Sequence, residues 1–241
     1  MKLRPEIIQE DDDLILVNKP AGYLTIPDRQ NPELPNLRRW LETHYPEVWT
    51  VHRLDRDTSG VLCFARHAEA HRHVSLQFQN RTVHKYYLAI TDGHPPRPSG
   101  EIDQPIGPHP SHSGQMRIDP RGKVAQTRYQ VQERYRLFSV LRAQILTGRT
   151  HQIRVHLASL GCPLLIDPLY GKREAFFLSE IKGKQYNLGK HQEERPLISR
   201  LTLHAHELTI QHPRSEEAIT VEAALPKDLR ALLRQLDKWG K

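Results

Sequence analysis

The sequence has no long apolar segment. None of its hydrophobic runs approaches the roughly 18 residues that a membrane-spanning helix needs, although the chain has 241 residues. Its first residues lead into the acidic run at positions 10–13 and not into the apolar stretch of a signal peptide. The sequence therefore predicts neither membrane insertion nor secretion.

Cysteine is also scarce. The chain has two cysteines, Cys63 and Cys162, and each lies in an apolar stretch with no second cysteine three positions away. This pattern excludes a disulfide framework and a paired-thiolate metal site, and it favours two buried thiols in a reducing compartment. We therefore expect a cytoplasmic protein.

Internal repeats, low-complexity tracts and Gly/Ser linkers are absent. A hydrophobic content of 37%, a charged content of 26% and a mean hydropathy of −0.64 are typical of a polar but folded chain. We therefore predict one domain over residues 1–241, with a core over about residues 14–225. Pro226 and the regularly spaced leucines after it predict a closing amphipathic helix over residues 226–239.

The local patterns predict an α+β fold. Apolar residues at helical spacing indicate amphipathic helices over residues 37–45 and 68–78. Short runs rich in valine, isoleucine and tyrosine indicate strands, of which the first begins near Leu14. The predicted strands cover residues 14–18, 61–65, 82–90, 125–133, 138–146, 201–210 and 218–223. We expect a mainly antiparallel central sheet flanked by helices and loops.

Two polar stretches, residues 93–122 and 172–196, have the composition of long loop excursions. Loops of such length usually carry a function. We therefore expect each of these two stretches to be either functional or mobile, and the sequence does not assign them a role.

The net charge of the chain is positive. It has 35 Lys and Arg against 28 Asp and Glu, which gives +7 and a sequence pI of about 9.5. Such an excess attracts a polyanionic partner, and it equally serves solubility alone. Composition by itself leaves both interpretations open.

A polar loop that ends in glycine precedes the predicted strand at residues 61–65. This loop holds Asp55 between Arg53 and Arg56. Neighbouring positive charge keeps a carboxylate ionised, and an ionised carboxylate acts as a nucleophile or a base. The same residue types also fit a salt-bridged turn that is capped by its own polar side chains.

Residues 147–157 have the pattern of a junction between a strand and a helix, with Thr150 as the N-cap. A helix that starts there places Ile153 and Leu157 on one apolar face and Arg154 on a neighbouring one. Arg154 then either reaches inward to bind a carboxylate or lies on the surface in contact with solvent.

Two adjacent tyrosines, Tyr86 and Tyr87, lie in the predicted strand at residues 82–90. The period of two in a strand sends them to opposite faces, so one of them at most lines a given pocket. A tyrosine stacks well on an extruded base, and it equally serves as a core residue.

Five motifs, in this order along the chain, resemble those of the RluA-type pseudouridine synthases. They cover about residues 14–225, and the second motif, at residues 52–60, is the family's signature. The motifs are NKPAG at 18–22, HRLDRDTSG at 52–60, KYYLA at 85–89, TGRTHQIRVHLASLG at 147–161 and LHAHEL at 203–208. Five ordered motifs arise by chance far less often than one short pattern, so the resemblance favours the catalytic interpretation.

The resemblance implies the pseudouridine synthase fold and an isomerase that acts on a specific uridine in RNA. The N1–C1′ bond breaks, the uracil turns, and C5 bonds to C1′. Asp55 corresponds to the family's catalytic aspartate, Tyr87 to its active-site tyrosine and Arg154 to the arginine that pairs with the aspartate. The family implies no cofactor and no metal. Whether Asp55 attacks C1′ or removes the 2′ proton stays open, because one carboxylate suits both routes.

The resemblance also implies a structured RNA as substrate, namely a stem-loop of rRNA or tRNA. Arg53 corresponds to the arginine that enters the base stack when the uridine is extruded. The expected substrate-binding residues are Arg53, His52, Thr58, Arg149 and His151. Only a short segment precedes Leu14, so we expect a stand-alone catalytic domain without the N-terminal S4-like RNA-binding domain of several relatives. We also expect this domain to be a monomer.

Three other interpretations are less well supported. Asp55 and Asp57 resemble the carboxylate pair of an N-glycoside hydrolase, but the flanking arginines favour ionisation of both and leave no general acid. A non-catalytic RNA-binding protein would not need the matched catalytic residues. A metal site is disfavoured because His151 and His156 are five positions apart and do not share a helix face.

Overall fold

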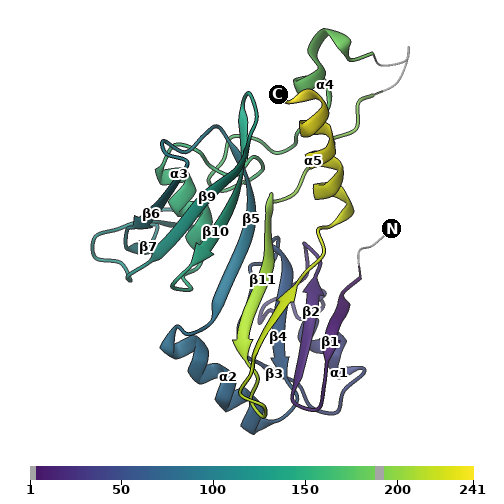
Figure 1. Cartoon of the computed structure of the whole chain (residues 1–241), viewed down its shortest axis with the longest axis vertical. Coiled ribbons are helices and arrows are strands. Elements are labelled where there is room, and N and C mark those ends of the chain that lie inside the picture. The colour runs from purple at the N-terminus through teal and green to yellow at the C-terminus, as the bar shows by residue number, and fades with distance from the viewer. Residues whose placement is uncertain (1–3, 188–192) are drawn as a thin grey trace. The chain divides into compact units, whose positions relative to one another are not determined.

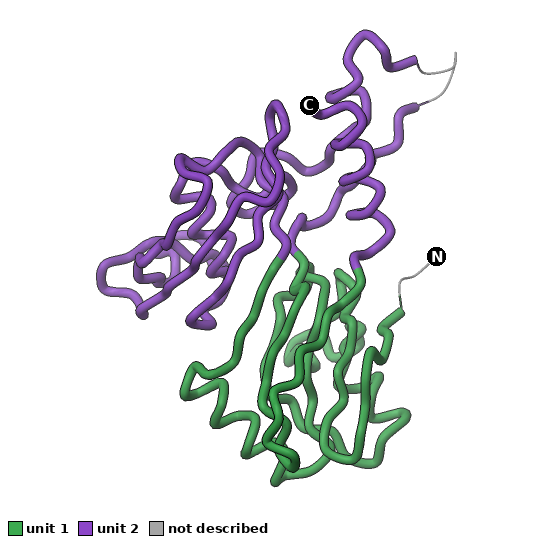
Figure 2. Tube along the Cα trace, in the orientation of Figure 1, with its two compact units in different colours: residues 1–87, 204–224 green, residues 88–203, 225–241 purple. Residues whose placement is uncertain are grey.

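The computed structural model describes residues 4–187 and 193–241. The chain divides into two compact units, each made of two segments (Figure 2). Unit 1 comprises Met1–Tyr87 and His204–Ala224, and unit 2 comprises Leu88–Leu203 and Leu225–Lys241. The prediction of one domain over residues 1–241 is not tested by this division and stays a prediction.

Unit 1 is built on a sheet with the strand order β1-β2-β4-β11, to which β3 adds on β4 and β12 adds on β11 (Figure 1). The strands are β1 (Glu6–Glu10), β2 (Leu14–Lys19), β3 (Trp49–Thr50), β4 (Ser59–Ala65), β11 (Leu203–Gln211) and β12 (Ala218–Glu222). These pairs are antiparallel except for β4 and β11, which run parallel. The helices α1 (Leu37–Glu42) and α2 (Ala68–Asn80) complete the unit.

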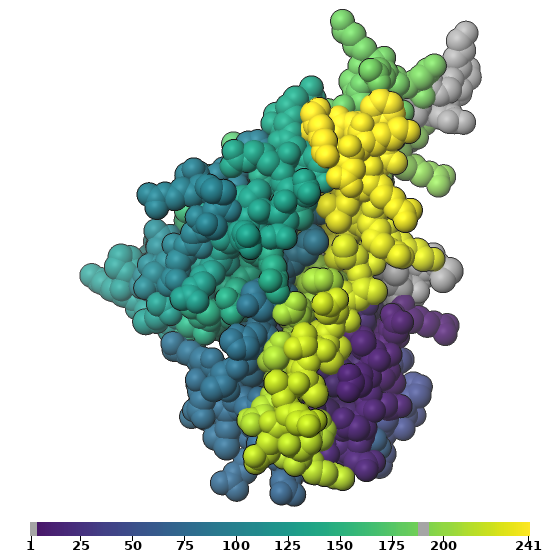
Figure 3. Space-filling model, viewed as in Figure 1, coloured from purple at the N-terminus to yellow at the C-terminus, as the bar shows by residue number. Residues whose placement is uncertain are grey.

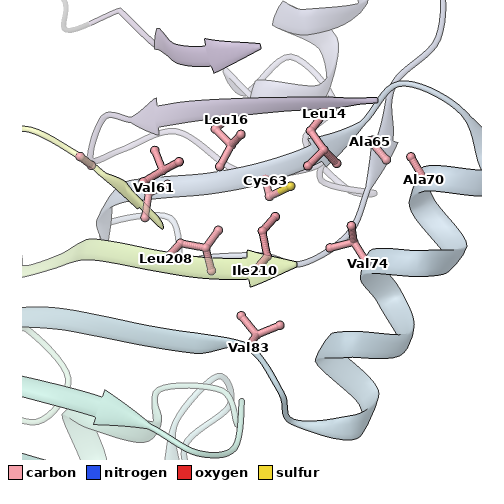
Figure 4. Packing of buried hydrophobic residues seen from close by; sticks show 12 residues of the cluster. Leu14, Leu16, Val61, Cys63, Ala65, Ala70, Val74, Val83, Leu208 and Ile210 are labelled. Atoms are coloured by element: carbon pink, nitrogen blue, oxygen red, sulfur yellow. The ribbon is translucent and has the colours of Figure 1, made fainter. Parts of the chain in front are cut away.

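The core of unit 1 lies between its sheet and α2 (Figure 4). Alternate residues of a strand point to the same face, so Leu14 and Leu16 of β2 meet Val61 and Cys63 of β4. Val74 contributes from α2. Every residue of β4 is buried, which makes this strand a rigid base for the polar loop that precedes it.

The chain after β12 returns to the first strands of unit 1. Asn18 in β2 donates a side-chain hydrogen bond to the carbonyl of Ala224 at 3.2 Å. In the space-filling view the β11–β12 hairpin, in yellow-green, lies beside the purple N-terminal strands (Figure 3). The two segments of unit 1 are therefore held together by side chains as well as by strand pairing.

Unit 2 contains the antiparallel strand order β10-β9-β6 and a separate hairpin of β7 and β8. Its elements are β6 (Ser99–Asp103), β7 (Ile106–Pro108), β8 (Met116–Ile118), β9 (Gln126–Arg134), β10 (Phe138–Ile145), α3 (Gln152–Ser159), α4 (Ser179–Lys182), a 3-10 turn (Gly183–Gln185) and α5 (Lys227–Trp239). The strand β5 (His84–Asp92) belongs to unit 1 up to Tyr87 and to unit 2 from Leu88. In the core of unit 2, Phe138 and Phe176 pack edge to face, with ring centroids 5.1 Å apart.

The predicted fold class is confirmed, because the pairing is mainly antiparallel and helices are few. Each predicted strand and helix has a counterpart within a few residues. The prediction that the first strand begins near Leu14 is wrong, since β1 precedes it. The sequence of β1 is EIIQE, with its ends exposed at the edge of the sheet, so it lacks the apolar content that marks an inner strand.

The interpretation of residues 93–122 as a loop excursion is also wrong, because this stretch contains β6, β7 and β8. β6 has one buried residue, Ile102, and lies at the end of its strand order, so it too escapes a search for apolar runs. The stretch 172–196 contains α4 and the 3-10 turn, and its residues 188–192 lie outside the described residues. Within residues 4–187 and 193–241, no helix has the length and apolar character needed to cross a membrane.

Candidate active site

The loop that carries Asp55 is fixed through its backbone. Leu54, which is buried, donates its N–H to the hydroxyl of Thr25 at 3.2 Å, and the same hydroxyl lies 3.2 Å from the carbonyl of Leu54, to which it donates. On the other side, the Thr58 N–H donates to the Asp55 carbonyl at 3.2 Å. The backbone of Asp55 is therefore held from both directions, while its half-buried side chain is not needed for these bonds.

Lys19 ties this loop to the turn that follows β2. Its side chain is completely buried, and its ammonium donates to the carbonyls of Tyr23 and Arg56 at 2.7 Å each and to that of Pro20 at 3.1 Å. Gly22, at a φ of +86°, adds a backbone bond of 2.9 Å to the Arg56 carbonyl. The Lys-Pro-Ala-Gly turn thus supports the residue next to Asp55, a role that the sequence analysis did not assign to Lys19.

The end of the loop is a close approach between two backbones. Gly60 has a φ of +123°, and a Cβ built on it would lie 2.1 Å from the carbonyl oxygen of Ala205 in β11. Beside it, the hydroxyl of Ser59 bonds Nδ1 of His204 at 2.9 Å, and Nε2 of His204 bonds the Ala223 carbonyl at 3.1 Å. Only glycine fits at position 60, because any other residue has a Cβ.

Tyr87 lies in β5 with its side chain buried, whereas its neighbour Tyr86 is half-buried on the opposite face. Burial raises the pKa of the Tyr87 phenol, and the negative charge of Asp55 raises it further. The phenol therefore stays protonated near neutral pH, and the assignment of Tyr87 and Asp55 to one active site stays a prediction.

His52, at the start of the loop, packs against an aromatic ring and lies near a lysine ammonium. Its ring stacks on Phe78 with centroids 4.5 Å apart, and its Nε2 accepts the N–H of Cys63 at 3.0 Å. Lys85 places its ammonium 5.4 Å from the centroid of the Phe78 ring. Burial, together with the charge of Lys85, lowers the pKa of His52 to about 3, and burial lowers the pKa of Lys85 to about 8. His52 is therefore neutral at physiological pH.

This depressed pKa predicts a pH dependence of stability. His52 titrates near 6.5 when unfolded and at about 3 when folded, so only the unfolded chain gains a proton as the pH falls through this window. Acidification from about pH 7.5 to about pH 5 should lower the free energy of unfolding by about 2 kcal/mol through this group. The variant His52→Gln should lack this component, because glutamine keeps an acceptor but does not titrate. Urea unfolding at both pH values measures the difference.

His112→Gln is the control for this prediction, because His112 is exposed. Its unfolding free energy should fall with pH as steeply as that of the unsubstituted chain. If the unfolding free energy of His52→Gln fell with pH as steeply as that of the unsubstituted chain, the burial of a neutral imidazole at this position would be contradicted.

The remaining predicted residues of the loop differ in exposure. Arg53 is exposed, and its side chain makes no hydrogen bond or ion pair with any residue in the part of the chain that the structure describes. Thr58 is buried. Nothing in the structure tests their contacts with a substrate, so the assignments of His52, Arg53 and Thr58 stay predictions.

The other predicted cluster begins at α3 in unit 2, and its helix start differs from the prediction. Thr150 is not the N-cap: that position is taken by His151, at a φ of +56° and without a side-chain capping bond. The first helical residue, Gln152, instead fixes the turn before the helix, because its side-chain oxygen accepts bonds from the Thr147 hydroxyl at 2.7 Å and the Arg149 N–H at 3.0 Å. Its amide nitrogen donates to the carbonyl of Gln126 at 2.8 Å. Side-chain bonds from the start of a helix to a distant strand have no local sequence signal.

Arg154 is buried in α3, which contradicts its interpretation as a surface residue. Its Nε and Nη2 each donate to one oxygen of Asp167 at 2.8 Å. The inward orientation toward a carboxylate is therefore confirmed, and one such carboxylate is Asp167. The pairing of Arg154 with Asp55 is not tested by these contacts and stays a prediction.

The two other predicted residues of unit 2 are half-buried and have partners there. Arg149 donates from Nε to the Val124 carbonyl at 2.9 Å, and Nδ1 of His151 bonds the Tyr170 hydroxyl at 2.8 Å. Their predicted contacts with the substrate stay predictions.

Asp167 and Tyr170 were not predicted from the sequence. Both lie in the segment Asp-Pro-Leu-Tyr-Gly at 167–171, which follows a buried apolar run. An aspartate before proline with a glycine four positions on is a turn signal. That signal indicates a turn but not which arginine the aspartate binds.

Among the described residues, one group has the spacing of a metal site: Asp11, Asp13 and His212. Asp13 already accepts bonds from His67 at 2.9 Å and Arg214 at 3.1 Å, so this group is an ion-pair network between turns of unit 1. It does not include the residues that the sequence analysis considered for a metal.

Comparisons with known proteins identify similar chains. Residues 13–159 match the family model described as RNA pseudouridylate synthase. The chain is 37% identical over 236 residues to ribosomal large subunit pseudouridine synthase D of Nitrosomonas europaea, which covers 96% of this chain and 65% of that protein. It is 38% identical over 216 residues to the dual-specificity RNA pseudouridine synthase RluA of Vibrio vulnificus, with 87% and 79% covered. The chain thus spans slightly less than two thirds of the first of these relatives.

Two solved human structures are also similar. Human RNA pseudouridylate synthase domain containing 4 matches with a TM-score of 0.72 and 27% identity, covering 96% of this chain and 92% of that one. Human RNA pseudouridylate synthase domain containing 1 matches with a TM-score of 0.69 and 27% identity, covering 92% and 84%. These likenesses confirm the fold that the sequence motifs implied.

Proposed function

Because the chain belongs to the RNA pseudouridylate synthase family, whose members are isomerases that act on RNA, we propose that it converts a specific uridine of ribosomal RNA into pseudouridine, with Asp55 as the catalytic carboxylate. The observation that carries this proposal is the position of Asp55. It lies in the family's signature loop, whose backbone is bonded on both sides of it by Thr25 and Thr58. Such preorganisation aims a reactive group without further ordering during the reaction.

The reaction balances within the nucleotide. The N1–C1′ bond breaks, the uracil turns, C5 bonds to C1′, and the proton on C5 leaves to solvent while N1 gains one. No oxidant or reductant enters this balance. The carboxylate of Asp55 either bonds to C1′ and is later displaced, or removes the 2′ proton and returns it.

Tyr87 is proposed to stack on the extruded uracil. Its burial and its coupling to Asp55 support a place beside the reacting sugar. A phenol whose pKa is raised remains a hydrogen-bond donor, so in its resting state Tyr87 acts as a neutral platform for the base. Arg53, which is exposed, is proposed to enter the space in the stack that the uridine leaves.

Arg154 is proposed to pair with Asp55 and keep it ionised, as the family resemblance implies. The support from unit 2 is that Arg154 is a buried guanidinium held by both oxygens of a carboxylate. An arginine stays charged at every physiological pH, and it therefore stabilises a neighbouring anion throughout the reaction.

The substrate class rests on the relatives. One is named a ribosomal large subunit synthase and another a dual-specificity RNA synthase. We propose large-subunit rRNA as the substrate and treat tRNA as an alternative outcome of the test. The net charge of +7 supports phosphate contacts, which position an RNA without reading its sequence. A cytoplasmic location and a monomeric state remain predictions.

The decisive experiment maps pseudouridines in rRNA and tRNA from cells with and without the gene. One or more sites in large-subunit rRNA should disappear with the gene and return when the unsubstituted chain, but not Asp55→Asn, is supplied. Sites lost only from tRNA would replace the proposed substrate. Release of free uracil by the purified protein would identify a hydrolase, and RNA binding without any conversion would identify a non-catalytic protein.

A further inference from the structure

Asp167 is a buried carboxylate with more partners than its arginine alone. Its side chain has no exposed surface, and both of its oxygens accept from Arg154 at 2.8 Å. Oδ1 also accepts the backbone N–H groups of Leu169 at 2.9 Å and Tyr170 at 3.1 Å. One carboxylate therefore fixes both the guanidinium of Arg154 and the turn that places Tyr170.

Tyr170 lies against the guanidinium that Asp167 binds. The Cζ atom of Arg154 is 5.0 Å from the centroid of the Tyr170 ring. The ring itself is fixed at its far end, because its hydroxyl bonds Nδ1 of His151 at 2.8 Å and accepts the Met116 N–H at 2.8 Å. The guanidinium is therefore oriented by a two-point fork at its edge and by an aromatic ring at its face.

The glycine that ends this turn keeps the arrangement compact. The N–H of Gly171 donates to the Asp167 carbonyl at 2.9 Å, and a Cβ on Gly171 would lie 2.8 Å from that oxygen. The turn from Asp167 to Gly171 therefore has little room for a side chain at position 171.

Stability alone is a weak reason for this fork. A buried ion pair costs so much desolvation that replacing both partners by apolar residues is often neutral or favourable. A planar fork between Arg and Asp does, however, set the plane of the guanidinium, which a flexible ammonium could not do. This points to a requirement on the orientation of Arg154.

We propose that Asp167 is a positioning residue for the isomerisation: it sets the plane of the Arg154 guanidinium, directly through the fork and indirectly through the ring of Tyr170. This inference rests on the proposed function, in which Arg154 pairs with the catalytic carboxylate. If the Arg154 guanidinium rotates away from the orientation that Asp167 sets, its remaining N–H donors meet the catalytic carboxylate at the wrong angle. The chemical step then slows while RNA binding is unaffected.

The variant Asp167→Asn tests the inference, since asparagine keeps the shape but loses the charge and one acceptor. We expect kcat for pseudouridine formation to fall about 10–100-fold, the range typical of residues that orient a functional group. KM should stay unchanged within about threefold. Asp167→Glu should not restore the rate fully, because a longer side chain moves the fork.

Asp228→Asn is the matched control. Asp228 forms the same two-point fork with Arg200 in the same unit, at 2.7 and 2.8 Å. Its loss removes a fork of the same geometry, though a more exposed one (side-chain exposures of 15% and 32% against 6% and 0%), from a residue with no proposed part in the reaction. Asp228→Asn should keep kcat within about twofold. An equal loss of kcat in both variants would overturn the inference, because it would reflect unit stability alone.

A double-mutant cycle separates positioning from folding. In an Arg154→Lys background there is no guanidinium plane to set, so adding Asp167→Asn should lower kcat by no more than about threefold. A merely structural role would lower the rate by the same factor in both backgrounds. If Asp167→Asn does not fold, Tyr170→Leu removes the ring from the guanidinium face and leaves the fork, and kcat should fall about tenfold with KM unchanged.

The possible outcomes distinguish this inference from the function on which it rests. If Arg154→Ala and Asp55→Asn are inactive while folded Asp167→Asn has the unsubstituted rate, the positioning role is wrong and the proposed function stands. If Arg154→Ala is fully active, the pairing proposed for Arg154 is wrong. If Asp55→Asn is fully active, the catalytic assignment itself is wrong.

Discussion

Asp55→Asn should lose at least about 10³-fold in the rate of pseudouridine formation, because the amide can neither bond to C1′ and leave nor accept the 2′ proton. The loss should appear in the chemical step. Single-turnover conversion of an RNA labelled with tritium at C5 measures it, since the label is released only when C5 bonds to C1′. The affinity for the same RNA should change by less than about threefold, because the phosphate contacts remain.

The fold should tolerate this substitution. The hydrogen bonds that hold the loop run to the backbone atoms of Leu54, Asp55 and Arg56, and asparagine has the same backbone and nearly the same shape. The unfolding free energy of Asp55→Asn should therefore lie within about 1 kcal/mol of the unsubstituted value. A lost rate with an intact fold and intact binding is what a catalytic group predicts.

Asp57→Asn is the control, because Asp57 is an exposed carboxylate two positions away in the same loop. It should retain the rate within about twofold. Retention of more than about a tenth of the rate by Asp55→Asn would show that another group performs the chemistry. Equal losses in the two variants would show that the charge of the loop matters and not one carboxylate.

Gly60→Ala should cause the largest loss of stability, with a fall of at least about 4 kcal/mol in the unfolding free energy or no folded protein at all. The added Cβ would lie 2.1 Å from the oxygen of Ala205 and 2.6 Å from its carbon and nitrogen, all of them backbone atoms. A backbone in a parallel strand pair cannot move aside as a side chain does. Denaturant unfolding followed by circular dichroism measures the effect.

Gly22→Ala isolates the part of this effect that comes from backbone conformation. Gly22 also has a positive φ, +86°, and lies in the same unit, but a Cβ there would have no atom within 4 Å. Its alanine variant should lose about 1 kcal/mol. Similar losses at positions 22 and 60 would mean that the close approach of β4 and β11 contributes nothing.

The elements that could be predicted from the sequence are those whose signal is local. β4 is a dense apolar run and α2 has apolar residues at helical spacing, and both appear where these patterns place them. β1 and β6 lie at the ends of their strand orders and have largely polar sequences, so burial gives them little signal. Local patterns reveal the inside of a sheet better than its edges.

The candidate site was predictable as residue types but not as a set of contacts. The motif identifies Asp55 from its neighbours in sequence. The hydrogen bonds that hold the backbone beside Asp55, however, come from Thr25 and Lys19, about 30 positions away or more. The same holds in unit 2, where Asp167 is 13 positions from Arg154. Such partners are set by the tertiary fold, and a single sequence holds no pattern for them.

The loop around Asp55 is anchored almost entirely through main-chain atoms. The ammonium of Lys19, the hydroxyl of Thr25 and the N–H of Gly22 all bond carbonyl or amide groups that every amino acid possesses. An exposed position such as 57, whose side chain has no proposed part in the frame or the reaction, can therefore change identity during evolution without loosening the frame that aims the carboxylate. A scaffold of this kind allows descendants to acquire new RNA targets by surface substitution while the reaction itself is inherited unchanged.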